Sequence, residues 1–189
     1  MRKQLALFAS GAGSNVENII RYFEHRSDVE VALIVCNKPD AKVLEIAKKY
    51  NIPSTLISRT SFYQTEDILN IFLIYDVNFI ILAGFLWLVP LYLVKAFPNR
   101  IINIHPALLP KYGGKGMFGM NVHEAVFANK EAETGITIHY VNEHYDQGAI
   151  LFQASTALSP SDTPADIAHK VHQLEYTFFP KIIDEVELN

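Results

Sequence analysis

The chain has 189 residues, of which 50% are hydrophobic and 19% charged, and its formal net charge at pH 7 is −4. This size and composition predict one folded domain and exclude a disordered or collagen-like protein. The acidic balance provides no basic field that would hold a nucleic acid through counterion release, so we expect no nucleic-acid partner. The single cysteine, Cys36, cannot pair within the chain, which favours a reducing, cytoplasmic location.

Two apolar segments resemble membrane signals, but parts of a folded core explain them better. The run at residues 5–9 is shorter than the apolar region of a signal peptide. Residues 77–94 carry no charge, but Gly84 and Pro90 interrupt them. A buried strand, a loop and the start of a helix account for this segment, so we expect no membrane partner.

The first half of the chain alternates short apolar runs with helical patterns. Continuous apolar runs predict buried strands at residues 5–9, 29–36, 55–57 and 79–83. Apolar residues at helical spacing predict helices from about residue 16, over 42–50 and near 66–75. Buried strands separated by helices are typical of a parallel sheet that is covered on both faces.

The second half has a different pattern. Pro90 can start a helix that runs to residue 96, and another apolar strand is predicted at residues 101–105. A glycine-rich loop at 111–121 and a short helix at 122–128 follow. The alternating segment 135–141 and its neighbour 149–154 predict an antiparallel edge. Thr163 and Pro164 are typical of the start of the last helix, which Pro180 should kink.

These elements predict an α/β fold, a Rossmann-like, open, twisted and mostly parallel sheet with helices on both faces. The antiparallel edge is expected in the C-terminal half. We expect a single domain over residues 1–189, with one half at 1–100 and the other at 101–189.

A loop with two glycines, Ser10-Gly11-Ala12-Gly13-Ser14-Asn15, joins the first predicted strand to the first helix. Open parallel sheets bind ligands at this edge, and the free N–H groups of a helix start suit a phosphate. The loop lacks the Lys of a P-loop, and Val16 stands at the third glycine of the dinucleotide fingerprint. Nucleoside triphosphate and NAD are therefore disfavoured, while an ordinary strand–helix turn stays an alternative.

A second candidate site lies at the end of the strand 101–105. Residues two apart share one face of a strand, so Asn103 and His105 should point the same way. An amide donor beside an imidazole can stabilise the oxyanion formed when a carbonyl is attacked, and the imidazole can move a proton. Asp146 would orient His105 and raise its pKa if the fold brought the two together. Structural roles, such as a turn cap for Asp146, fit the same residues.

The other reactive side chains form no recognisable site. His123 lacks the second His of a zinc-binding helix, and His139 and His144 lack ligands at metal spacing. Cys36 lies in an apolar strand without a neighbouring His, which disfavours nucleophilic catalysis. Glu175 interrupts the apolar face of the last helix and is either an edge charge or a substrate ligand.

In their order along the chain, four motifs resemble the glycinamide ribonucleotide branch of the folate-dependent formyltransferases. They are Ser10-Gly11-Ala12-Gly13-Ser14-Asn15, Ala83-Gly84-Phe85, Asn103-Ile104-His105-Pro106-Ala107-Leu108-Leu109-Pro110-Lys111-Tyr112 and Asp146-Gln147-Gly148. The resemblance covers essentially the whole chain. It implies transfer of the formyl group of 10-formyltetrahydrofolate, as co-substrate, to the amine of glycinamide ribonucleotide in purine biosynthesis, with no metal.

The resemblance also implies roles for individual residues. The catalytic residues would be Asn103, His105 and Asp146, and the residues that bind the substrate phosphate would be Gly13, Ser14 and Asn15. The folate contacts would be Leu86, Trp87, Leu88, Val89, Asn103, Asn142, Glu143, His144, Tyr145 and Asp146. The ribonucleotide contacts would be His172, Gln173, Leu174 and Glu175. Small molecules are the expected partners of a monomer or weak homodimer.

The chain departs from the family pattern in three places. Trp87 stands where the family often has Arg. Phe62-Tyr63-Gln64 occupies a region where an Arg of the family often touches the folate, so no residue is assigned to that role. The loop 111–121 is longer and richer in glycine than the usual form, and we expect it to move.

Other functions within the superfamily are less consistent with the sequence. Residues 122–126 and 134–137 look like the corresponding stretch of methionyl-tRNA formyltransferases, but we expect no basic C-terminal domain here. A 10-formyltetrahydrofolate hydrolase carries an extra domain ahead of this one, which the sequence does not predict. A sugar-nucleotide formyltransferase lacks the loop 10–15 in this form, and a pure binding module would not need the catalytic residues.

Overall fold

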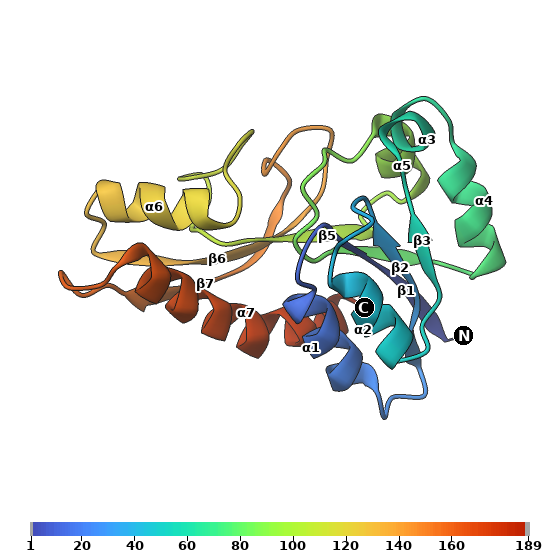
Figure 1. Cartoon of the computed structure of the whole chain (residues 1–189), viewed down its shortest axis with the longest axis horizontal. Helices are drawn as coiled ribbons and strands as arrows, with labels where there is room; N and C mark the ends of the chain where they lie inside the picture. Colours follow the sequence, from blue (N-terminus) through green and yellow to red (C-terminus); the bar gives the residue numbers. More distant parts are fainter. Residues whose placement is uncertain (1, 188–189) are drawn as a thin grey trace. The chain divides into compact units, whose positions relative to one another are not determined.

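The computed structural model describes residues 2–187, and its strands form one seven-stranded sheet in the order β3-β2-β1-β4-β5-β6-β7 (Figure 1). Strand β1 pairs in parallel with β2 and β4, β2 pairs in parallel with β3, and β6 pairs with β7 in antiparallel fashion. The predicted fold class, a mostly parallel sheet with an antiparallel C-terminal edge, is therefore confirmed. The chain forms two compact units, Met1–Ile102 and Asn103–Asn189.

The first unit contains the parallel strands and five helices, and it ends within β5. Its elements are β1 Lys3–Ala9, α1 Ser14–Phe23, β2 Val29–Cys36, α2 Val43–Lys49, β3 Ser54–Leu56, α3 Arg59–Tyr63, α4 Asp67–Ile74, β4 Phe79–Leu82, α5 Leu91–Ala96 and the start of β5 Ile101–His105. All four residues of β4 and the last five of β1 are buried. This burial explains why these strands are continuous apolar runs without alternation.

A cluster of aromatic rings forms part of the core of this unit. The Phe8 ring, which is fully buried, lies 6.3 Å from Phe62, 6.2 Å from Phe72 and 5.1 Å from Phe85, measured between ring centroids. The contacts with Phe72 and Phe85 are edge-on, the arrangement that aromatic quadrupoles favour. Phe8 therefore connects β1 to α3, α4 and the segment after β4.

Helix α3 is absent from the elements expected from the sequence. Its first turn is stabilised by a reciprocal cap, in which Ser58 Oγ accepts a hydrogen bond from Ser61 N–H and Ser61 Oγ accepts one from Ser58 N–H. In the usual sequence signal for such a cap, Glu or Gln stands three residues after the capping Ser or Thr. Ser61 stands at that position here, so the reciprocal cap forms without the sequence pattern that would have predicted it.

The second unit contains the rest of β5 and the antiparallel edge. Its other elements are α6 Met120–Ala128, β6 Glu133–Tyr140, β7 Ile150–Ala157 and α7 Pro164–Glu187. The start of α7 matches the sequence expectation, because Thr163 N–H donates to Asp166 Oδ2 at 2.8 Å and Pro164 is the first helical residue. Among the described residues, no helix combines the length and the apolar character needed to cross a membrane.

The aromatic cluster leads to a stability prediction. Phe8→Ala removes a fully buried ring, and we expect the free energy of unfolding to fall by about 3–5 kcal/mol in urea denaturation. Leu73→Ala is the matched control, because Leu73 lies on α4 with 76% of its surface exposed. The control should stay within about 0.5 kcal/mol of the parent protein. Similar losses for both variants would contradict the assigned role of Phe8.

Candidate active site

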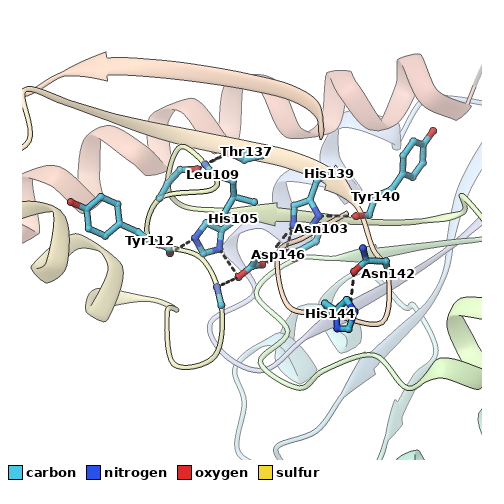
Figure 2. Close-up of polar contacts among 12 residues, drawn as sticks. Asn103, His105, Leu109, Tyr112, Thr137, His139, Tyr140, Asn142, His144 and Asp146 are labelled. Carbon is cyan, nitrogen blue, oxygen red and sulfur yellow. Dashed lines mark hydrogen bonds and ion pairs between the residues drawn. The ribbon is translucent and has the colours of Figure 1, made fainter. Parts of the chain in front are cut away.

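One carboxylate brings the three predicted catalytic side chains together. Asn103 and His105 lie on β5, and Asp146 lies in the loop between β6 and β7. Asp146 Oδ1 accepts a hydrogen bond from Asn103 Nδ2 at 3.4 Å, and Asp146 Oδ2 lies 3.5 Å from His105 Nδ1 (Figure 2). The two carboxylate oxygens therefore face different partners, and Asn103 and His105 share a face of β5 as the strand period predicts.

The backbone of the β6–β7 loop places Asp146 in this position. Asp146 has a left-handed backbone with φ 56°, a conformation that Asp tolerates better than most residues. The loop closes where Tyr140 N–H donates to Ala149 O at 2.9 Å. A Cβ on Gly148 would lie 1.6 Å from Tyr140 O, so only glycine fits there.

His105 is buried, and both of its ring nitrogens face acceptors. Its Nε2 lies 2.7 Å from Tyr112 O, and a carbonyl only accepts, so Nε2 carries a hydrogen (Figure 2). Burial lowers the pKa of His105 below 6.5, although the charge of Asp146 and the bond to Tyr112 O act in the opposite direction. Asp146 thus raises the pKa as expected, but burial outweighs it, and His105 is neutral at neutral pH.

Asp146 is ionised in this arrangement. Burial raises its pKa, but the contacts with His139, His105 and the backbone N–H of Gly114 together lower it by more. Gly114 N–H donates to Asp146 Oδ2 at 2.9 Å, so the glycine-rich loop supplies one of the donors. The net pKa of Asp146 lies below 3.8, which keeps a full negative charge beside His105.

His139 also belongs to this group, although its sequence context indicated no role beyond excluding a metal ligand. Its Nδ1 lies 2.7 Å from Tyr140 O, and a carbonyl only accepts, so this nitrogen carries a hydrogen. Its Nε2 then accepts from Asn103 Nδ2 at 3.1 Å and fixes the orientation of the amide. The alternating pattern of 135–141, which places Thr137 and His139 on one face, is the signal that could have identified both residues.

Thr137 anchors the loop that follows β5. Its hydroxyl, which is fully buried, donates to Ala107 O at 2.7 Å and accepts from Leu109 N–H at 3.0 Å (Figure 2). Gln153 Nε2 donates to the same hydroxyl at 2.8 Å and to Leu109 O at 3.1 Å. These bonds fix the start of the glycine-rich loop behind His105.

A second set of contacts holds Tyr112. Its hydroxyl donates to Glu131 Oε1 at 2.8 Å, and Lys111 Nζ lies 3.0 Å from the same oxygen. Tyr112 has φ 57°, an unfavourable backbone for a bulky side chain. The hydroxyl bond therefore helps to keep the Tyr112 carbonyl directed at His105.

In the first unit, the loop 10–15 leads directly into α1. Gly13 is the N-cap of α1 with φ 75°, and no side-chain hydrogen bond caps this helix. A Cβ on Gly13 would lie 2.8 Å from Val43 Cγ2, so both the backbone and the packing require glycine. The exposed Ser14 is the first residue of the helix, and the arrangement can bind an anion through backbone N–H groups.

Ser10 connects this loop to the predicted folate segment 86–89. Ser10 Oγ accepts from Leu86 N–H at 3.0 Å, and Ser10 N–H donates to Gly84 O at 3.0 Å. The carbonyl of Leu88 accepts a bond from Tyr63 Oη at 2.9 Å. Leu86 N–H and Leu88 O are thus already bonded, which leaves other backbone groups of this segment for a ligand.

The remaining predicted residues lie in two places of the second unit. In the loop 142–146, Asn142 Oδ1 accepts from His144 N–H at 2.9 Å, while Glu143 is exposed and Tyr145 half-buried (Figure 2). On α7, Glu175 is buried, which excludes the edge-charge alternative. Leu174 is half-buried, and the exposed Gln173 bonds to His169.

His123 on α6 is a buried histidine outside the predicted residue set. It is 2% exposed, and its Nδ1 has no hydrogen-bond partner among the described residues. The His172 ring meets it edge-on at 6.4 Å between centroids. Burial and the neighbouring His172 and His105 lower the pKa of His123 to about 4. Within residues 2–187, no group of three or more His, Cys, Asp or Glu is placed to hold a metal.

The lowered pKa of His123 predicts a loss of stability in acid. Between about pH 6.5 and pH 4 the unfolded chain binds more protons than the folded one, so stability is complete above this window and falls as the pH drops through it. We expect this one histidine to lower the free energy of unfolding by about 2–3 kcal/mol between about pH 7 and pH 4.5. His123→Asn should remove this amount from the pH dependence of the unfolding free energy, measured in urea. His25→Asn, at an exposed position, is the control, and equal pH dependence in both variants would refute the prediction.

Comparison with known proteins agrees with the family resemblance of the sequence motifs. The sequence model of the formyl transferase family matches residues 3–183. The chain is 39% identical to the chloroplastic phosphoribosylglycinamide formyltransferase of Arabidopsis thaliana over 98% of its own length and 65% of that protein. It is 36% identical to the Bacillus subtilis phosphoribosylglycinamide formyltransferase over 97% of its length and 94% of that protein. It spans 65% and 60% of the two plant relatives, from Arabidopsis thaliana and Vigna unguiculata.

Solved structures of the same enzymes share the fold. The phosphoribosylglycinamide formyltransferase of Anaplasma phagocytophilum matches with a TM-score of 0.87 and 31% identity, over 97% of this chain and 86% of that one. The Bacillus halodurans enzyme matches with a TM-score of 0.87 and 32% identity, over 97% of this chain and 95% of that one. These matches cover both compact units.

Proposed function

Because the chain belongs to the formyl transferase family, we propose that it transfers the formyl group of 10-formyltetrahydrofolate to the primary amine of glycinamide ribonucleotide. The products are formylglycinamide ribonucleotide and tetrahydrofolate, in purine biosynthesis. The observation that carries the proposal is the contact of Asn103 and His105 with the two oxygens of Asp146. The names of the relatives support the choice of substrates.

Residues 1–189 then act as one formyltransferase domain. The half at 1–100 binds the ribonucleotide phosphate, and the half at 101–189 supplies the catalytic groups and the second folate loop. The reaction takes place in the cytoplasm, between small molecules, on a monomer or weak homodimer. Cys36 is a buried free cysteine, which fits a reducing compartment.

The chemistry is addition to a carbonyl followed by elimination. The neutral amine forms a bond to the formyl carbon, and the formyl oxygen gains negative charge. The bond from that carbon to N10 of the folate then breaks, the amine loses a proton and N10 gains one. Atoms and charge balance without a metal or a covalent enzyme intermediate, and holding both substrates together can lower the barrier by roughly 7–11 kcal/mol.

His105 moves the proton in this scheme. In the resting structure its Nε2 hydrogen is bonded to Tyr112 O, so a substrate must take the place of that carbonyl. When the imidazole gains a proton, Asp146 offers an acceptor to Nδ1 at 3.5 Å. A histidine of lowered pKa returns that proton readily, which suits protonation of the departing folate nitrogen.

Asn103 stabilises the developing oxyanion. Both of its amide hydrogens are bonded in the resting structure, one to His139 Nε2 at 3.1 Å and one to Asp146 Oδ1 at 3.4 Å. The bond to Asp146 is the longer one, and the formyl oxygen replaces it when the substrate binds. The bond to His139 keeps the amide oriented while this exchange takes place.

The ribonucleotide is held through its phosphate and its amine. The phosphate lies on the start of α1, at Gly13, Ser14 and Asn15, where the helix dipole is positive. On α7, the residues from His172 to Glu175 contact the rest of the ribonucleotide. The buried Glu175 carboxylate orients the amine.

A direct assay tests the function. Purified protein, 10-formyltetrahydrofolate and glycinamide ribonucleotide should together give tetrahydrofolate and the formylated product, and omission of the ribonucleotide should stop both. His105→Ala should reduce kcat by about a hundredfold or more, with the fold retained by circular dichroism. His25→Ala, at an exposed position, is the control. Folate release with water alone would show a hydrolase, and full turnover by His105→Ala would end the catalytic assignment.

A second variant tests the phosphate loop. Ser14→Ala removes one donor at the start of α1, so we expect KM for the ribonucleotide to rise about fivefold to tenfold, with KM for the folate unchanged. Ser27→Ala, another exposed serine of the same unit, should leave both values as they are. Steady-state kinetics at saturating folate measures the effect, and an unchanged KM in Ser14→Ala would contradict the assigned phosphate contact.

A further inference from the structure

A cation lies over the one tryptophan of the chain. The guanidinium carbon of Arg59, the first residue of α3, lies 5.1 Å from the centroid of the Trp87 ring. The Arg59 side chain is exposed, and Trp87 is half-buried. A guanidinium over an indole face is the most favourable of the common cation–π pairs, and it leaves the N–H edges of the guanidinium available.

Trp87 is held in place by three other rings. Its centroid lies 6.0 Å from Phe62, 6.0 Å from Tyr63 and 6.1 Å from Phe85. Phe62 and Phe85 are buried, so the indole packs on a fixed base. The indole in turn restricts where the Arg59 side chain lies, which reduces the entropy that a ligand must remove on binding.

The charge of Arg59 has no counter-ion in the described part of the chain, as no ion pair or hydrogen bond of its side chain is formed there. Other arginines of the same unit are paired: Arg26 with Asp28 at 2.7 Å, and Arg21 with Glu17 at 3.1 Å. Arg100 lies over Phe97 at 5.3 Å but donates to Ala96 O. Arg59 is thus an oriented cation whose donors are available to an anion.

Trp87 belongs to the segment 86–89, to which the family resemblance assigns folate contacts, and Arg59 lies against this segment through the Trp87 ring. Tyr63, which packs against Trp87, donates to Leu88 O at 2.9 Å and so joins α3 to this segment. The folate carries an aminobenzoyl ring and a glutamate with two carboxylates. These are the groups that an indole edge and a free guanidinium recognise.

We propose that Arg59, oriented by Trp87, binds a carboxylate of the glutamate tail of 10-formyltetrahydrofolate. The inference rests on the proposed function. It gives Arg59 the role of the arginines that the family often has at positions 62–64 and 87, where this chain has none. Trp87 carries no charge where the family often has Arg, but its ring holds the guanidinium of Arg59, from α3, beside the segment 86–89. Arg59 is a specificity residue in this scheme, because it touches the tail and not the reacting atoms.

The experiment compares two folates that differ only in the tail. We expect Arg59→Ala to raise KM for 10-formyltetrahydrofolate roughly tenfold, with kcat and KM for the ribonucleotide unchanged. With the diamide, in which both tail carboxylates are neutral amides, parent and variant should have the same KM. Arg100→Ala removes an equal charge from a similar ring pair and should behave as the parent protein.

Trp87 provides a readout that does not depend on catalysis. As the chain has one tryptophan, titration of its fluorescence with tetrahydrofolate and with its diamide reports binding at this residue. Arg59→Ala should weaken binding of tetrahydrofolate roughly tenfold and leave the diamide unaffected. Equal affinities in parent and variant, or an equal loss for both ligands, would overturn the proposal. An inactive protein that still shows the selective loss would refute the proposed reaction and keep the tail site.

Discussion

The contacts of the Asp146 carboxylate hold the catalytic side chains together. Its Oδ1 accepts from Asn103, and its Oδ2 faces His105 and accepts from the backbone of Gly114. Three separate segments, the end of β5, the glycine-rich loop and the β6–β7 loop, thus meet at one charged group. Removal of this charge would take the acceptor from two half-buried donors, the Asn103 amide and the Gly114 N–H, at the same time.

Burial and charge act against each other at His105. Burial disfavours the imidazolium, while Asp146 and the Tyr112 carbonyl favour it, and burial is the largest of these influences. The result is a neutral ring with an acceptor already beside each nitrogen. Such a ring accepts a proton when substrate chemistry supplies one and returns it easily, which a permanently charged imidazolium does not.

The sequence predicts the sheet well, because apolar residues are continuous in the buried strands β1 and β4 and alternate with polar ones in β6. The shared face of Asn103 and His105 follows from the strand period, but the approach of Asp146 follows only from the family resemblance, since spacing carries no such information. The Tyr112 carbonyl and the Gly114 N–H were missed because backbone groups are the same in every residue. The pairing of Arg59 with Trp87 depends on α3, whose serine cap lacks the usual acidic signal.

Ser10 has a consequence for the order in which two ligands act on the protein. Its hydroxyl and its N–H both bond to the segment that follows β4, and its own chain continues into the start of α1. Ser10 therefore links the loop before α1 to the segment after β4 by two hydrogen bonds. Where binding at one segment moves the other, thermodynamic reciprocity gives both ligands the same factor of change in dissociation constant.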